Sequence, residues 1–388
     1  MDFTQLLVVE AASVLAGPLV GQFFAELGAR VIKFENAQTG GDVTRSWRTT
    51  GENARADISA YFSCANFGKE SIAVNLHLES DTNLLRDAIS KADIFLHNWK
   101  AGDAEKFGFD VESCCALNSK LIYGSISGYG EHNARVGYDA IVQAESGLMS
   151  VNGEATGGAT KMPVAMVDIM AAHQLKQGIL VALLRRQSTG KGGAVHVSLI
   201  ESAVSSLVNQ GTNYLHTGVV PKREGSDHPN IVPYGTVFRT KDNEEILLAI
   251  GTDAQFNDVC AVLNITPDPR FATNHERVKN RRDVLTMLQA AISGVTADMF
   301  LNDCLRANIP AGRVQSVATA LESSYAEPVI IASEGIKGIR TKVFHTHSND
   351  HVSVLLRPPH LNEHGDKLRR EFGRVNGSAE DDAYESAE

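Results

Sequence analysis

A long helix that leads into a strand is encoded by residues 163–199, which read PVAMVDIMAAHQLKQGILVALLRRQSTGKGGAVHVSL. From Ile169 to Arg186 the apolar residues recur at three- and four-residue intervals, which predicts a helix packed on one face. Thr189 and Gly190 follow and predict the end of this helix. The run GAVHVSL, residues 193–199, predicts a strand.

Asp168 stands at the beginning of this predicted helix and has two interpretations. Asp is a favoured N-cap residue, so the carboxylate could serve only to cap the helix. Alternatively, unpaired N–H groups and the helix dipole would keep a partly buried carboxylate ionised, and such a group is a usable nucleophile. No Glu or Gln lies three residues further on to complete a capping box, and the approach PVAMV is apolar. Both interpretations stay open on this stretch alone.

Short apolar runs alternate with helical segments through about residue 200, which predicts βαβ units and a largely parallel sheet. The predicted fold class is therefore α/β, with a Rossmann-like large domain. Strands are predicted at residues 6–10, 31–35, 71–76, 93–98, 121–127 and 193–199, and helices at residues 17–27, 81–92 and 139–146.

A chain of 388 residues favours two domains. Residues 218–233, GVVPKREGSDHPNIVP, are rich in Pro, Gly and charge and predict a boundary. A smaller α+β unit follows, with strands at 234–239 and 245–250 and helices near 253–263, 281–291 and 297–307. We predict a large domain formed by residues 1–217 and 332–375, a small domain of residues 218–331, and a disordered acidic tail at 376–388.

Composition excludes several classes of protein. A net charge of −10 argues against nucleic acid as a partner. The N-terminus lacks the charged region of a signal peptide, and no apolar run reaches the length needed to span a membrane. Five cysteines without a CxxC pair suit reduced thiols, namely Cys64, Cys114, Cys115, Cys260 and Cys304. We predict a cytoplasmic protein without membrane partners.

The common cofactor motifs are missing. Residues 10–21, EAASVLAGPLVG, lack the G-x-G-x-x-G of dinucleotide binding. Residues 188–193, STGKGG, are not a P-loop, because no Ser or Thr follows the Lys. His345, His347 and His351 could face one metal from alternate strand positions, but three histidines in a polar hairpin are more often simply solvated. We predict no metal and no permanently bound cofactor.

A glycine-rich segment at residues 125–153 adds a second candidate site. There Tyr138 and Asp139 open a predicted helix. Asp139 could cap that helix or support a reactive group.

Eight motifs occur in the same order as in the family III CoA-transferases, the group of formyl-CoA transferase and carnitine CoA-transferase. They are AGPLVGQFFAELGARVIKFE, GDVTR, NFGKESIAVNL, ADIFLHNWKAGDAEKFGF, LIYGSISGYG, GYDAIVQAESGLMS, the Asp168 region and TGKGGAVHVSL. The resemblance runs from about residue 3 to residue 215. It continues more weakly through DPRFATNHERVKNR, NIPAGRV and PPHLNEHGD.

This resemblance implies that Asp168 is a covalent nucleophile. It would exchange CoA between an acyl-CoA and a small acid, such as a dicarboxylic acid, through anhydride and thioester intermediates. Tyr138 and Asp139 match an active-site aromatic residue and its neighbour. The positions that match CoA contacts are Val14, Ala16, Asn36, Val74, Asn75, Asn98 and Lys106. Asn36 replaces an Arg that is frequent in relatives, and the family's small-domain glycine loop has no obvious counterpart. The resemblance also implies an interlocked homodimer.

Two alternatives remain beside the transferase. The α-methylacyl-CoA racemases resemble this chain nearly as well, but they pair the Asp with a His in a GHD motif that reads Gly137-Tyr138-Asp139 here. Because the reference pKa of Tyr is about 10, Tyr138 is a poor proton shuttle at neutral pH. His132 and His173 are near in sequence but off the motif. The second alternative is a non-catalytic protein that binds acyl-CoA.

Overall fold

The computed structural model describes residues 2–344 and 354–373 and divides the chain into two compact units. The first unit contains residues 1–146, 163–208 and 328–388, and the second contains residues 147–162 and 209–327. The sequence-based boundaries differ from this division mainly at residues 147–162, which had been assigned to the large domain. The acidic tail and the three histidines His345, His347 and His351 lie outside the described residues.

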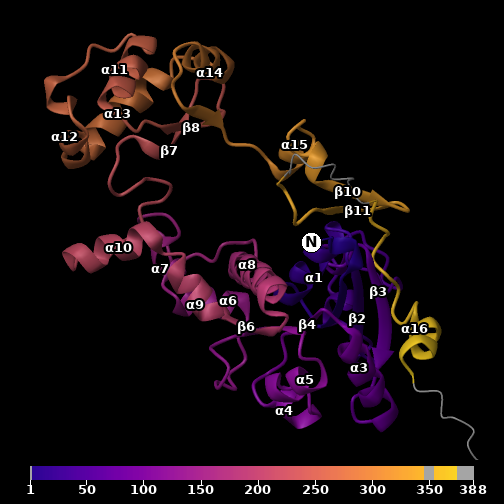
Figure 1. Cartoon of the computed structure of the whole chain (residues 1–388). Helices are drawn as coiled ribbons and strands as arrows, with labels where there is room; N and C mark the ends of the chain where they lie inside the picture. Colours follow the sequence, from indigo (N-terminus) through magenta and orange to yellow (C-terminus); the bar gives the residue numbers. More distant parts are fainter. Residues whose placement is uncertain (1, 345–353, 374–388) are drawn as a thin grey trace, which may run out of the picture. The chain divides into compact units, whose positions relative to one another are not determined.

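A six-stranded parallel sheet forms the centre of the first unit, with strand order β3-β2-β1-β4-β5-β6 (Figure 1). This is the order of the Rossmann fold, with its reversal between β1 and β4. The strands are β1 (Leu7–Ala11), β2 (Arg30–Asn36), β3 (Lys69–Val74), β4 (Ile94–His97), β5 (Ile122–Ser127) and β6 (Gly193–Ser198). Every one corresponds to a strand predicted from the sequence, so the predicted parallel α/β sheet is confirmed.

Helices connect and cover these strands. They are α1 (Ala16–Glu26), α2 (Ala60–Ser63), α3 (Glu79–Lys91), α4 (Asp103–Phe107), α5 (Val111–Leu117), α6 (Asp139–Glu145), α8 (Met166–Thr189), α9 (Leu199–Ser205) and α16 (Gly365–Phe372). Short 3₁₀ turns span Phe3–Gln5, Ala37–Thr39 and Val43–Ser46. A hairpin of β10 (Ile330–Ser333) and β11 (Ile336–Ile339) belongs to the same unit. The C-terminal helix α16 packs on α3 and β3, where Leu368 and Phe372 join the core.

Helix α8 packs against α1, α9, β5 and β6. Gly178 allows this close approach, because a Cβ there would lie 2.4 Å from Cγ1 of Val195 on β6. By length and mean hydropathy α8 is also the one described helix that could cross a membrane without a bend, so the prediction that no apolar segment is long enough was wrong. Buried residues such as Ala172, Leu175 and Ile179 place it in the core of this unit instead.

The second unit has its own antiparallel sheet, with order β7-β8-β9. Its strands are β7 (Tyr234–Arg239), β8 (Glu245–Ala249) and β9 (Ala311–Arg313). Its helices are α7 (Leu148–Val151), α11 (Asp253–Val262), α12 (Asn274–Lys279), α13 (Arg281–Ile292), α14 (Ala297–Arg306) and α15 (Val317–Leu321), with a 3₁₀ turn at Pro269–Phe271. Helix α10 (Val208–Thr217) and the 3₁₀ turn Glu327–Val329 contain two of the four boundaries between the units. A buried apolar cluster of β7, β8, α11, α13 and α14 holds this unit together.

Candidate functional site

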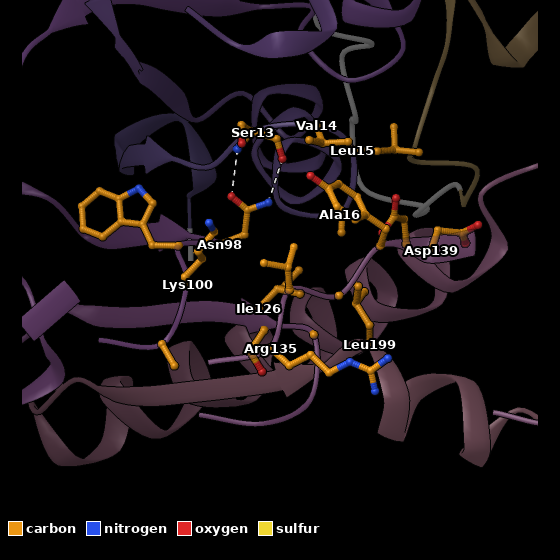
Figure 2. Close-up of a pocket in the computed structure, with 18 of the residues that line it drawn as sticks. Ser13, Val14, Leu15, Ala16, Asn98, Lys100, Ile126, Arg135, Asp139 and Leu199 are labelled. Atoms are coloured by element: carbon orange, nitrogen blue, oxygen red, sulfur yellow. Dashed lines mark hydrogen bonds between the residues drawn. The ribbon is translucent and has the colours of Figure 1, made fainter. Parts of the chain in front are cut away.

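A pocket of about 210 Å³ opens at the carboxyl ends of β1, β4 and β5, where the strand order reverses (Figure 2). Open α/β sheets bind their ligands at this position. We call it the first pocket. Its wall is formed by Ser13, Val14, Leu15, Ala16, Asn98, Trp99, Lys100, Ala101, Ile126, Ser127, Gly128, Asn133, Arg135, Val136, Gly137, Tyr138, Asp139, Asp168 and Leu199. The structure thus brings together six residues predicted from the sequence, which are Val14, Ala16, Asn98, Tyr138, Asp139 and Asp168.

Asp168 is the third residue of α8 and not its cap. The N-cap position is held by Ala165, which makes no side-chain hydrogen bond to the helix. Only 8% of Asp168 is exposed, and among the described residues none donates a hydrogen bond to its carboxylate. Burial, reinforced by the nearby charge of Asp139, raises the pKa of Asp168 from 3.8 to about 7. The effect of burial and of Asp139 on this pKa is thus opposite in direction to the effect expected of the helix dipole.

Asp139 caps α8 from another helix. It is the first residue of α6, and its Oδ1 accepts a hydrogen bond of 2.8 Å from the backbone N–H of Val167. Its Oδ2 accepts a second bond of 2.7 Å from the amide of Gln143. The N–H of Val167 is one of the unpaired donors at the start of α8. Asp139 therefore fixes the turn that carries Asp168, which differs from the predicted cap on its own helix.

Tyr138 precedes Asp139 and is 58% exposed. The chain can fold back here because Gly128 and Gly137 touch through their backbones, and a Cβ on Gly128 would lie 2.5 Å from Cα of Gly137.

None of the residues that line the first pocket is a histidine. His132 and His173 are both exposed and neither lines it.

Asn98 holds the loop between β1 and α1. Its side-chain oxygen accepts from the N–H of Ser13 at 2.9 Å, and its side-chain amide donates to the carbonyl of Ser13 at 2.7 Å. Figure 2 shows both bonds as dashed lines. The two polar atoms of Asn98 are thus already engaged with the protein backbone.

A second pocket of about 200 Å³ lies beside β2 and β3 and contains the predicted residues Asn36 and Val74. Trp99 lines both pockets. Two further predicted CoA contacts line neither pocket. Asn75 is tied into a turn, where its N–H donates to Asp81 at 2.7 Å, and the ammonium group of Lys106 lies over the ring of Phe107 at 5.0 Å.

Sequence reasoning missed several neighbours of Asp168. The pKa of Tyr61 is raised to about 12 by burial and by nearby negative charges, that of Asp168 first among them. Tyr61 packs edge-on against Trp47, with ring centroids 5.1 Å apart. Arg135, in the pocket wall, lies over the ring of Tyr129 and pairs with Glu145. No local pattern marks these residues, because only tertiary contacts bring them to the site.

Within residues 2–344 and 354–373, no group of three His, Cys, Asp or Glu side chains is arranged to hold a metal ion. The polar groups in the first pocket are two carboxylates, two amides, two serine hydroxyl groups, one phenol, one indole and two cationic side chains. Such a set suits acyl chemistry at a carboxylate.

The chain is similar to known proteins along most of its length. A sequence model of the family described as CoA-transferase family III matches residues 3–365. The succinate–glutarate CoA-transferase of Agrobacterium fabrum is 35% identical over 395 residues, which cover 96% of this chain and 96% of that protein. The acetyl-CoA:oxalate CoA-transferase of Acetobacter aceti is 34% identical over 383 residues, with 95% of each protein covered.

A crystal structure of a CaiB/BaiF family protein from Brucella suis has a similar fold. It matches with a TM-score of 0.82 and 36% sequence identity, and the match covers 96% of this chain and 99% of that chain.

Proposed function

Because the chain belongs to CoA-transferase family III and is a CoA-transferase, we propose that it moves CoA between dicarboxylic acids with Asp168 as the covalent nucleophile. The observation that carries this proposal is a buried carboxylate, without hydrogen bonds from the described residues, in the wall of a pocket at the switch point of the sheet. A poorly solvated carboxylate is more reactive once it is ionised, since little water must be removed before attack.

The reaction needs four steps. The carboxylate of Asp168 attacks the thioester carbonyl, which gives an aspartyl–acyl anhydride and CoA thiolate. The thiolate attacks the aspartyl carbonyl, releases the first acid and forms an aspartyl-CoA thioester. The acceptor carboxylate then displaces CoA as a second anhydride, and the thiolate attacks the acceptor carbonyl to leave as the new thioester. Asp168 is regenerated as a carboxylate, and no proton is transferred.

We propose that the two pockets bind the two ends of one extended CoA ester. We place its thioester in the first pocket beside Asp168 and its nucleotide end in the second pocket beside Asn36 and Val74, with Trp99 between them. A complex in which the adenine of CoA lies away from Asn36 and Val74 would contradict this placement. The interlocked homodimer that the family resemblance implies stays a prediction.

A dicarboxylic substrate is supported by charge and by relatives. Lys100 adds a cationic group to the wall that holds Asp168, where a second carboxylate could be neutralised, whereas Arg135 in the same wall already pairs with Glu145. The similar enzymes from Agrobacterium fabrum and Acetobacter aceti carry succinate, glutarate and oxalate in their names.

The proposal is tested by incubating the protein with succinyl-CoA and a panel of free acids and by identifying the thioesters by mass. We expect glutaryl-CoA or another dicarboxylic thioester to form faster than butyryl-CoA, and hydroxylamine to modify Asp168 only when acyl-CoA is present. Transfer to monocarboxylic acids alone would contradict the dicarboxylic assignment. An unmodified Asp168 peptide during active transfer would contradict the covalent mechanism.

The raised pKa of Asp168 predicts a pH dependence. Only the ionised carboxylate attacks, so kcat/KM should fall about tenfold per pH unit below pH 7 and level off above it.

Asp139→Asn keeps an oxygen for the N–H of Val167 but removes a negative charge, so the pKa of Asp168 should fall and the profile should move to lower pH. Profiles of both proteins with one donor and acceptor pair would check this. A profile that stays in place would show that Asp139 does not influence the nucleophile through its charge.

A further inference from the structure

Val14 adopts a backbone conformation that its side chain disfavours. Its φ is +70°, in the left-handed region that a β-branched residue rarely enters. The turn lets four consecutive residues, from Ser13 to Ala16, line the first pocket as the chain leaves β1 and enters α1. Backbone strain of this kind persists only where the surrounding structure enforces it.

The carboxylate of Asp42 accepts a hydrogen bond from the backbone at this turn. Its two oxygens lie 3.2 Å from the N–H of Val14, and one of them also accepts the N–H and the hydroxyl group of Thr44, at 3.1 and 2.8 Å. Asp42 is 3% exposed. Its burial opposes the charged form, but the ammonium group of Lys33 and the bonds from Thr44 outweigh that effect and hold the pKa of Asp42 below its usual range.

Lys33 links this carboxylate to the same loop. Its Nζ lies 3.1 Å from Oδ2 of Asp42 and donates a hydrogen bond of 2.6 Å to the carbonyl of Ala12. Lys33 is fully buried, as is its other partner Glu10 at 3.0 Å. The ammonium group therefore balances the charge of Asp42, so the loop is held without adding net negative charge beside a pocket for an anionic CoA ester.

We propose that Asp42, assisted by Lys33, is a positioning residue for CoA transfer, which holds Val14 in its left-handed conformation so that the β1–α1 loop keeps the shape that receives the thioester. This inference rests on the proposed function. Asp42 acts through the backbone of Val14 and does not itself line the first pocket.

The test is a double-mutant cycle between Asp42→Asn and Val14→Gly. Asp42→Asn preserves size but weakens the acceptor and loses the charge paired with Lys33, so Val14 is free to relax. We expect the KM for acyl-CoA to rise about tenfold, with a smaller change in kcat. Glycine adopts positive φ without strain. Adding Val14→Gly to the Asp42→Asn variant should therefore lower the KM for acyl-CoA again, by at least about threefold.

A merely structural role for Asp42 predicts the opposite. The two substitutions would then multiply their effects, and the double variant would be worse than Asp42→Asn, which would overturn the proposal. Asp93→Asn is the matched control, because Asp93 also accepts a backbone N–H, from Leu7 at 3.0 Å, and pairs with a cation, Arg186 at 3.0 Å, but at the other end of β1. Its KM for acyl-CoA should stay unchanged.

A measurement of CoA binding distinguishes the role of Asp42 in the loop from the proposed transferase activity. The dissociation constant of CoA, measured by titration calorimetry, needs no catalysis and should follow the same pattern of loss and recovery. If no acyl transfer occurs but that pattern holds, the proposed function fails and the role of Asp42 in the loop stands. If transfer occurs and CoA binding is equal in all variants, the role of Asp42 fails alone.

Discussion

Replacing Asp168 by asparagine should lower the rate of CoA transfer by at least about 10³-fold, because the amide cannot form the acyl anhydride. The same change should stabilise the fold. Asp168 is ionised in the folded protein only above a pKa of about 7, against 3.8 as its ordinary value. Charging it at higher pH therefore costs roughly 4 kcal/mol of folding free energy, which asparagine avoids.

The stability gained by Asp168→Asn depends on pH, because it comes from the ionisation of Asp168. A carboxyl group whose pKa is higher in the folded state binds more protons there, so the protein loses stability as pH rises from about 4 to 7. The advantage of Asp168→Asn should thus be largest near pH 8 and disappear toward pH 4. Initial rates and urea unfolding at pH 5 and pH 8 would measure both effects. Near-normal transfer by this variant would exclude Asp168 as the nucleophile, and equal stability at both pH values would exclude the raised pKa.

Removing the carboxylate of Glu10 should destabilise the protein by about 3–5 kcal/mol, because it leaves two ammonium groups buried without it. Glu10 accepts hydrogen bonds from Lys33 at 3.0 Å and from Lys69 at 2.7 and 2.9 Å, and all three side chains are fully buried. Burial already lowers the pKa of Lys69 to about 8 with Glu10 present. Urea unfolding of Glu10→Ala at pH 7 would give the size of the loss.

Glu371→Ala is the control for that measurement. Glu371 pairs with Arg30 at 2.5 Å, but both side chains are about one-third exposed, so the change should be within about 1 kcal/mol. Equal losses for the two variants would mean that burial does not determine the importance of the Glu10 network. Because Lys33 also contacts Asp42, Glu10→Ala should in addition weaken CoA binding.

Hydrophobic patterning was sufficient to predict the parallel sheet. The strands β1 and β4 consist almost entirely of buried residues, most of which are apolar, and buried strands of this kind stand out as apolar runs. The position of Asp168 near the start of α8 was also predictable, because the apolar spacing marks the helix. Its charge state was not, because that depends on Asp139, 29 positions earlier, and on a depth of burial that no local pattern encodes.

The hydrogen bonds that hold the loop at the first pocket could not be predicted from local sequence either. Asn98 bonds to Ser13 across 85 positions, and Asp42 bonds to Val14 across 28. A resemblance to relatives could mark Asn98 as a site residue, but only the fold shows that its side chain is bound to the backbone. Asn75 and Lys106 show the converse, since both matched family positions but line neither pocket.

The two tryptophans of this chain make the site visible to spectroscopy. Trp99 lines both pockets, and Trp47 packs on Tyr61, which lies within the electrostatic reach of Asp168. With no third indole in the sequence, the tryptophan fluorescence of the protein, excited selectively over tyrosine, originates at this site and its surroundings. Arrival of a CoA ester, departure of a product acid and ionisation of the buried carboxylate can therefore be followed by emission in real time, without an attached dye.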